Sequence, residues 1–144
     1  MICFTRLFII ILFIKINREN TFTTQALSYL LSKLSECSKL QNLSLNLEQT
    51  YITDHFTKNL GSELSKCTSL SSLDLNLSYL GDIAVSNLGI GDKGVKDLCF
   101  SIAKCKNLKE LLLGFNWKKT SDRSAADLCQ DLSRCDTLSD FLLM

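Results

Sequence analysis

The 144-residue sequence predicts an α/β solenoid, in which parallel strands form a sheet that is backed by helices. Two observations predict this fold class. A leucine-rich segment that begins with a cysteine occurs four times, and successive copies start 30, 38 and 30 residues apart. A helical pattern precedes each copy. A single strand and a single helix of this length cannot each bury an apolar face, so neighbouring copies must stack on one another.

The strands are predicted by leucines that alternate with polar residues. The four segments are Cys37–Leu47, Cys67–Leu77, Cys105–Phe115 and Cys135–Leu143. In the first segment Leu43, Leu45 and Leu47 point to one side, whereas Ser44 and Asn46 point to the other. One side of the predicted sheet therefore faces the core, and the other side is open to solvent.

The helices are predicted by apolar residues that recur in steps of three and four. Three of these sets are Leu27, Leu30, Leu34 and Cys37; Val95, Leu98, Ile102 and Cys105; and Ala125, Leu128, Leu132 and Cys135. The remaining copy keeps Leu60, Leu64 and Cys67 but carries Thr57 at the first place, with Phe56 beside it. One face of each helix should therefore pack on the sheet.

An aspartate recurs where three of the helices should begin. Asp54, Asp92 and Asp122 each precede the next cysteine by 13 residues, and Thr24 has the same place before Cys37. A short acidic side chain can accept hydrogen bonds from the free amides of the first helical turn. We therefore expect the three aspartates to be N-caps.

The repeated pattern resembles the leucine-rich repeats of the ribonuclease-inhibitor type. Leu-x-x-Leu-x-Leu is followed by Ile-Gly-Asp-x-Gly at residues 90–94 and then by Leu-x-x-x-Leu. The leading cysteine, together with Ile52, Thr53 and Asp54, is similar to the cysteine-containing class found in F-box proteins. The resemblance covers residues 23–144, about four repeats of which the last is truncated. It implies a curved solenoid with strands on the concave side and helices on the convex side.

Two features depart from that family pattern. Both classes usually place Asn or Cys three positions after the last leucine of the motif, where this chain has Glu48, Ser78 and Asn116. The turn after each strand should therefore differ from the family geometry. The 38-residue spacing also holds a local echo, because residues 80–88 repeat the pattern of residues 90–98. We interpret this echo as an inserted segment at an edge or on the convex side.

The two ends of the sequence have their own patterns. Residues 1–22 are an apolar N-terminal segment with two open interpretations. Leu7, Ile10, Leu12 and Ile14 match the leucine pattern 33 residues before Leu40, which predicts a degenerate repeat strand. Residues 1–16, with a basic residue before an apolar run, also suit a signal or anchor. At the other end the sequence stops within a strand pattern, so we expect a fragment with further repeats or an end that docks on a partner.

Composition and charge narrow the function classes. The 16 Lys and Arg residues against 15 Asp and Glu leave a net charge of +1, so no overall field attracts the chain to nucleic acid or to an anionic membrane. The seven cysteines are odd in number, and most recur at matching places in the repeat. This usage predicts buried, reduced thiols and a cytoplasmic protein rather than a disulfide framework.

No motif predicts catalysis, a metal or a cofactor. Paired zinc-binding cysteines are usually separated by about two to four residues, whereas five residues separate Cys99 from Cys105. His55 is the one histidine and stands beside Asp54 at a helix start, where a surface role is expected. Residues 89–94 resemble a phosphate loop but lack its Gly-Lys-Ser/Thr ending. We therefore expect a non-catalytic chain without cofactors.

The open face of the sheet is the predicted contact surface for a protein partner. Strand alternation places on it Ser44, Asn46, Asp74, Asn76, Glu110, Leu112, Asn116 and Leu142. The column Ser44, Asp74, Leu112 and Leu142 changes from polar to apolar, and an apolar end with an acidic flank can supply an anchor and a rim. An ordinary solvated face is the alternative. Trp117 after the third strand is either a contact residue or packs the turn.

The predicted function is therefore a protein–protein interaction module, a scaffold or recognition fragment of a larger leucine-rich-repeat protein. We expect a protein partner, no nucleic acid and no membrane. The alternative function is a membrane-anchored or secreted repeat protein, in which residues 1–16 serve targeting and the cysteines oxidise.

Overall fold

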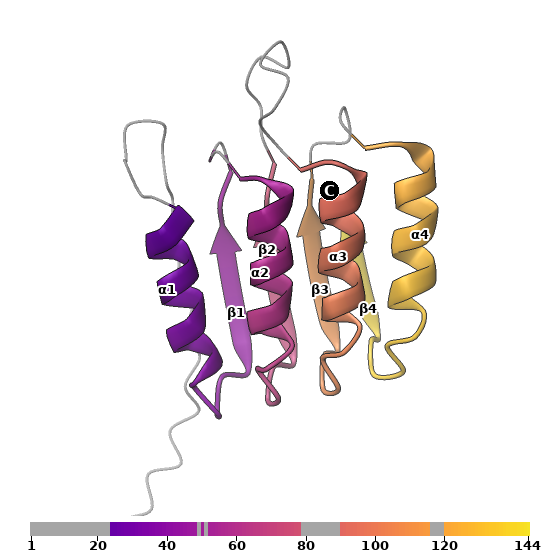
Figure 1. Ribbon diagram of the computed structural model, residues 1–144. Helices are drawn as coiled ribbons and strands as arrows, with labels where there is room; N and C mark the ends of the chain where they lie inside the picture. The colour runs from indigo at the N-terminus through magenta and orange to yellow at the C-terminus, as the bar shows by residue number, and fades with distance from the viewer. Residues whose placement is uncertain (1–23, 49, 51, 79–89, 116–119) are drawn as a thin grey trace, which may run out of the picture.

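Helices and strands alternate along the chain in a computed structural model that describes residues 24–48, 50, 52–78, 90–115 and 120–144 (Figure 1). The helices are α1 (Thr24–Ser35), α2 (Asp54–Leu64), α3 (Asp92–Ile102) and α4 (Asp122–Leu132). The strands are β1 (Asn42–Asn46), β2 (Ser72–Asn76), β3 (Glu110–Gly114) and β4 (Asp140–Leu143). The predictions for residues 1–22, for the insertion at 80–88, and for Asn116 and Trp117 fall outside the described residues.

The four strands form one parallel sheet in the order of the sequence, β1-β2-β3-β4. The helices lie in a second layer over one face of this sheet, and each packs beside the helix of the next copy (Figure 1). The predicted α/β arrangement, a parallel sheet backed by helices, is therefore the one observed.

The strand register joins equivalent leucines of successive copies. Leu43 pairs with Leu73, and Leu73 pairs with Leu111. These three side chains are at most 2% exposed, because they point into the layer between the sheet and the helices. The residues that alternate with the leucines along β1 and β2 are half-buried on the opposite face. The predicted alternation is thus confirmed, and the core lies on one side of the sheet.

A repeated set of hydrogen bonds fixes where each strand starts against its neighbour. The carbonyl oxygen of Gln41 accepts from the amides of Ser71 and Ser72 at 2.8 and 2.9 Å. The carbonyls of Ser71 and Lys109 each accept in the same way from two amides of the next copy. The Ser71 hydroxyl also donates to Gln41, and that of Ser139 donates to Lys109. These bonds therefore set the register of successive copies just before the first leucine of each strand.

The predicted helix faces pack on the sheet at most positions. The buried residues from the predicted sets are Leu27, Leu34, Phe56, Thr57, Leu60, Leu64, Cys67, Val95, Leu98, Ile102, Cys105, Leu128, Leu132 and Cys135. In α4 the prediction was wrong for Ala125, which is only partly buried, whereas Ser124 is buried. The prediction was wrong in part for α1, where Leu31 is buried, Leu30 is only partly buried and Cys37 is exposed. Among the described helices α1 packs beside α2 alone, so its buried face turns toward α2.

The three aspartates that we expected to be N-caps are not N-caps, and two of them have a different role. The helices begin at Asp54, Asp92 and Asp122, and the N-cap residues are Thr53, Gly91 and Ser121, without side-chain cap hydrogen bonds. Asp54 Oδ1 instead accepts from the Gly91 amide at 2.8 Å. Asp92 accepts from the amide and hydroxyl of Ser121 at 2.8 and 2.9 Å. Each of these two carboxylates therefore ties the start of its helix to the start of the next one.

The hydrogen bonds of Asp92 also change its acidity. The hydroxyl of Ser124 and the amide and hydroxyl of Ser121 stabilise the charged carboxylate, so they hold the pKa of Asp92 below its usual value. The tie between α3 and α4 is therefore made by an ionised side chain at neutral pH.

Gly94 leaves the space that the Asp54 carboxylate needs. A Cβ atom at Gly94 would meet that carboxylate and would lie 2.8 Å from both Ile90 Cγ2 and Thr57 Oγ1. The same close approach occurs lower in the helix layer, where a Cβ at Gly61 would lie 2.7 Å from Ser101 Cβ. Glycine at these two places lets α2 and α3 pack closely.

Four of the six described cysteines are buried, and two are not. Cys67, Cys99, Cys105 and Cys135 are buried as predicted, whereas Cys37 and Cys129 are exposed. All six are free thiols. Burial disfavours the thiolate and raises the pKa of Cys67 to about 11 and those of Cys99 and Cys105 to about 12. These three thiols are therefore protonated and unreactive at neutral pH.

Within the described ranges, no helix is both long and apolar enough to cross a membrane.

Replacing Gly94 with alanine should lower the free energy of unfolding by about 2 kcal/mol or more. Overpacking costs about 1–3 kcal/mol, and displacing the Asp54 carboxylate from Gly91 costs about 1.5–3 kcal/mol more. The helix propensity of alanine returns only about 1 kcal/mol. Urea denaturation of the purified chain measures the difference.

Gly91→Ala is the matched control for this experiment. A Cβ at Gly91 would lie 3.7 Å from Asp54 Oδ2, an ordinary contact, and the backbone there is extended with φ of −97°. We expect a change within about 0.5 kcal/mol. Equal destabilisation by the two alanines would contradict the proposed packing of Asp54 on Gly94.

Thiol modification should separate the two classes of cysteine. We expect a maleimide to label Cys37 and Cys129 in the native chain at neutral pH, and to label the four buried cysteines only after unfolding. At pH 9 Cys67, Cys99 and Cys105 should stay protected, because their raised pKa keeps them protonated. Peptide mapping by mass spectrometry identifies the labelled positions. Native labelling of Cys105 at a rate like that of Cys37 would contradict the burial.

Candidate protein-binding surface

The face of the sheet that the helices leave open carries the predicted contact residues. The strand register places Ser44, Asp74, Leu112 and Leu142 in one row across β1, β2, β3 and β4. A parallel row two residues earlier joins Asn42, Ser72, Glu110 and Asp140. The sequence predicted the first row residue by residue. The structure therefore brings seven of the eight predicted site residues onto one face, and Asn116 lies outside the described residues.

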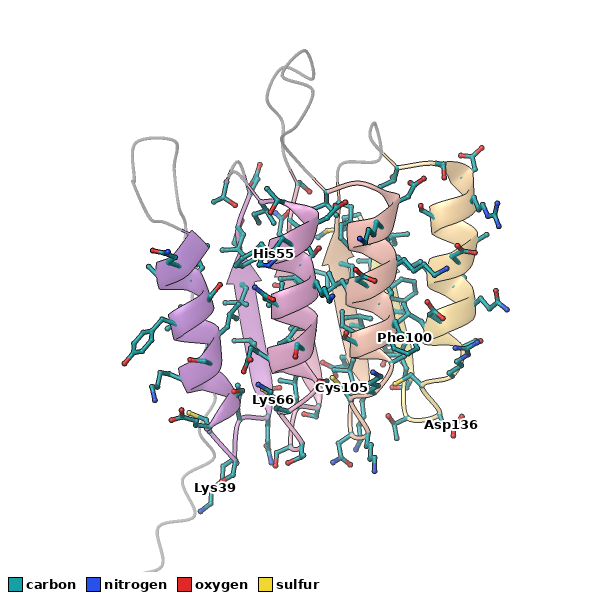
Figure 2. The ribbon with its side chains drawn as sticks, viewed as in Figure 1. Lys39, His55, Lys66, Phe100, Cys105 and Asp136 are labelled. Carbon is teal, nitrogen blue, oxygen red and sulfur yellow. The ribbon has the colours of Figure 1, made fainter. Side chains whose placement is uncertain are left out.

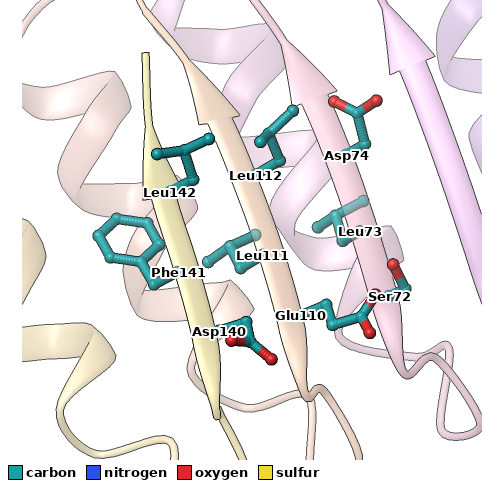
Figure 3. A pocket seen from close by; sticks show the side chains of 9 residues that line it. All are labelled: Ser72, Leu73, Asp74, Glu110, Leu111, Leu112, Asp140, Phe141 and Leu142. Carbon is teal, nitrogen blue, oxygen red and sulfur yellow. The ribbon is translucent and has the colours of Figure 1, made fainter.

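Two leucines form an apolar patch on this face. Leu112 is half-buried, and Leu142, its register partner on β4, is 56% exposed. They line a groove of about 390 Å³ that runs over β2, β3 and β4 (Figure 3). Phe141, which is 38% exposed, also lines this groove. Exposed side chains of this size on a sheet face are typical of a contact surface.

Three carboxylates border the two leucines. Figure 3 shows Asp74 beside Leu112 in the upper row, with Glu110 and Asp140 in the row below. Asp74 Oδ2 accepts from the Ser44 hydroxyl at 2.8 Å, which holds the carboxylate on the open face. None of the three carboxylates has an ion-pair partner within the described part of the chain.

The described basic residues lie outside the strands. The lysines and arginines that the structure describes lie in helices or in the segments that connect helices to strands, and none is within a strand. Lys109, which directly precedes β3, comes nearest in sequence. The ion pairs of the described residues join neighbours at or near helix ends, as in Lys66 with Glu63 at 2.6 Å. Among the described residues the sheet face is therefore acidic, and the helix layer carries both signs of charge.

Sequence reasoning missed a row of asparagines at the ends of the strands. Asn46 Oδ1 accepts from the Glu48 amide at 3.0 Å, and Asn76 Oδ1 accepts from the Ser78 amide at 3.1 Å. These side chains hold the turn after each strand, two positions before the place where the family pattern puts its asparagine. The recurrence of asparagine directly after the second strand leucine in two copies was the sequence signal that could have revealed this role.

Gly114 has the equivalent place in β3 and pairs in register with Asn76. It is buried, and a Cβ there would lie 2.9 Å from Asn76 Oδ1. The Asn76 side chain therefore covers the glycine. Asn46 and Asn76, both predicted contact residues, act first in holding the turns.

The helix side offers a weaker candidate. A hollow of about 400 Å³ lies between α3 and α4, and Phe100 lines it (Figure 2). Lys104 Nζ lies 4.2 Å from the centre of the Phe100 ring, so the chain's own lysine already covers part of that ring. The lining mixes basic Lys96 and Arg134 with acidic side chains, so it does not select a partner of one charge.

The described groups that could take part in catalysis or bind a ligand ion lie apart from the groove. His55 is exposed on α2 in the helix layer, as predicted, and its Nδ1 is 3.5 Å from Asn59 Nδ2 (Figure 2). The Gly91 amide, part of the segment that resembles a phosphate loop, already binds the Asp54 carboxylate. Over the described residues, no group of three or more His, Cys, Asp or Glu side chains is placed to hold a metal ion.

Comparison with known proteins gives a fold and no family. No protein-family model matches the sequence, and no curated protein matches it. A solved structure described as Leiomodin-1 Actin-Binding Site 2 (ABS2) matches with a TM-score of 0.68 and 17% identity, covering 92% of this chain and 69% of that chain. The tropomodulin C-terminal domain of Caenorhabditis elegans matches with a TM-score of 0.66 and 12% identity, covering 96% and 75%. The chain shares its fold with these two domains.

Serine substitutions at neighbouring positions of β3 should separate the two faces of the sheet. Leu111→Ser places a hydroxyl in the core at a side chain that is 2% exposed, and it should cost about 3–5 kcal/mol. Leu112→Ser acts on the open face and should cost less than about 1 kcal/mol. Thermal unfolding followed by circular dichroism measures both. Similar losses for the two variants would contradict the assignment of the open face.

Proposed function

We propose that this chain is a non-catalytic protein-binding module whose open sheet face is the contact surface. The observation that carries the proposal is the groove in which Leu112 and Leu142 are bordered by Asp74, Glu110 and Asp140. An apolar centre with a charged rim is the usual composition of a protein interface. The contact residues are those predicted from the sequence, Ser44, Asn46, Asp74, Asn76, Glu110, Leu112, Asn116 and Leu142.

A binding role also agrees with the chemistry of the face. The groove presents carboxylates, a serine and apolar side chains, and none of the described residues that line it is a histidine or a cysteine. Cys67, Cys99 and Cys105 are protonated, so they are poor nucleophiles. Free thiols in a folded chain suit a reducing compartment, and we propose that the module acts in the cytoplasm.

We further propose that the copies are leucine-rich repeats of a curved solenoid with the sheet on its concave side. The constant register between successive strands and the matching ties between helix starts support stacked repeats. The assignment to the ribonuclease-inhibitor type with features of the cysteine-containing type is part of this proposal.

Actin is the first partner to test. One of the structures that share this fold is described as an actin-binding site, and fold alone does not carry a partner from one chain to another. The purified chain should therefore be mixed with actin monomers and, separately, with filaments. Fluorescence of labelled monomers and co-sedimentation with filaments measure the affinities.

The variant Leu112→Ser/Leu142→Ser tests whether the open face makes the contact. Because removing two central apolar side chains costs a typical interface at least about 1.4 kcal/mol, we expect a loss of about tenfold or more in affinity for actin. Phe100→Ser is the control, since it removes an exposed aromatic from the helix layer.

Two results would contradict the proposal at different points. If the wild-type chain binds neither form of actin, the partner is wrong. If the double variant binds as tightly as the wild type while circular dichroism shows that it is folded, the open face is not the contact surface.

A further inference from the structure

The groove on the open face has an unusual charge arrangement for a folded sheet. Glu110 and Asp140 stand directly opposite each other on β3 and β4. Like charges at opposite positions of neighbouring strands destabilise a sheet. Within the described residues neither carboxylate has an ion-pair partner, and the Asp140 contact given by the structure is with the Ser139 hydroxyl at 3.2 Å. A cation from outside the chain would relieve this repulsion.

The apolar side chains lie one step along the same strands. Leu112 and Leu142 are two residues beyond Glu110 and Asp140, which is about 6.6 Å along a strand. Asp74 stands at the other end of the leucine row, on β2. A ligand that fills the groove therefore needs an aliphatic group over the two leucines. It also needs a positive charge two residues away along an extended chain, at about 6.6 Å from the aliphatic group.

We propose that the groove binds an extended peptide segment of a partner protein in which leucine-like and basic residues alternate, in the pattern basic-x-apolar. In an extended chain, side chains at positions i and i+2 lie on one side and about 6.6 Å apart, which matches the spacing of the two rows. The apolar side chain would cover Leu112 and Leu142, and the Lys or Arg side chain would lie over Glu110 and Asp140. This inference rests on the proposed function, since it names the chemistry of the partner at that face.

The charges argue against the other occupants of such a groove. A nucleic acid or an anionic lipid surface would bring phosphates to three carboxylates, with no described strand residue to attract them. A metal ion alone would leave the exposed part of Leu142 in water. A basic and apolar segment is the one ligand class that answers both the charge and the apolar surface of the groove.

The test uses fluorescein-labelled synthetic peptides and the whole chain. The probe is Ser-Lys-Ser-Leu-Ser-Lys-Ser, and its matched peptides replace both lysines with Glu, or leucine with Ser, or place the two lysines next to each other. Fluorescence anisotropy measures binding at low and high salt. We expect saturable binding of the probe that weakens with salt, and a loss of about tenfold or more for each matched peptide.

Two triple variants, each of which removes three negative charges, locate the binding site. Asp74→Asn/Glu110→Gln/Asp140→Asn removes the groove carboxylates, and we expect it to weaken the probe about tenfold or more and to remove most of the salt dependence. Glu36→Gln/Asp127→Asn/Asp136→Asn removes three carboxylates from the helices and turns, and it should change the affinity less than about twofold. Circular dichroism checks that both variants are folded.

Each other outcome overturns the inference. The first three outcomes are no saturable binding of the probe, equal binding of the Glu peptide, and equal weakening by the two triple variants. The fourth is a dimer in analytical ultracentrifugation that the groove variant abolishes, because a second copy of the chain would then occupy the groove. The actin experiment separates the two proposals. Loss of actin binding in Leu112→Ser/Leu142→Ser without probe binding would leave the contact face standing and reject its basic-x-apolar chemistry, whereas probe binding without actin binding would reject only actin.

Discussion

The parallel register between copies is the constraint on which the rest of the structure depends. One strand and one helix bury too little apolar surface to be stable alone, so each copy relies on the next. The carbonyls of Gln41, Ser71 and Lys109 hold the strand starts of successive copies together, and the carboxylates of Asp54 and Asp92 hold helix starts together. Both ends of the repeating unit are thus fixed by polar bonds, and the leucines between them fill one continuous core.

This constraint explains what could be predicted from the sequence. A side-chain period of two leaves a leucine strand one choice of buried face, so the row Ser44, Asp74, Leu112, Leu142 follows from counting. The fold class follows from the same repeat. The exposure of Cys37 did not follow, because the outer face of α1 depends on which helices pack beside it and not on its own periodicity. Cys129 is likewise exposed on α4.

The polar details were beyond sequence reasoning for a different reason. A local rule predicts an N-cap for an aspartate at a helix start, but Asp54 lies next to an amide that is 37 residues away in the chain. The bond to that amide depends on Gly94, which provides the space for the carboxylate. In the same way Asn46 and Asn76 hold turns that a comparison with the family pattern would assign to later positions. Long-range partners decide the role of such side chains, and only the stacked copies bring them together.

The same stacking orders the open face of the sheet, which we propose as the contact surface. Glu110, Leu112, Asp140 and Leu142 stand on strands whose backbones are already paired, so a ligand would order few groups on this side when it binds. In the unbound chain, Glu110 and Asp140 repel each other and Leu142 is exposed to water, and both features destabilise the native state. A segment that brings a cation and an aliphatic group removes both costs from the native state and leaves the unfolded chain unaffected. The proposed binding and the stability of the sheet are therefore linked, because a partner that binds only the folded chain would also stabilise β3 and β4.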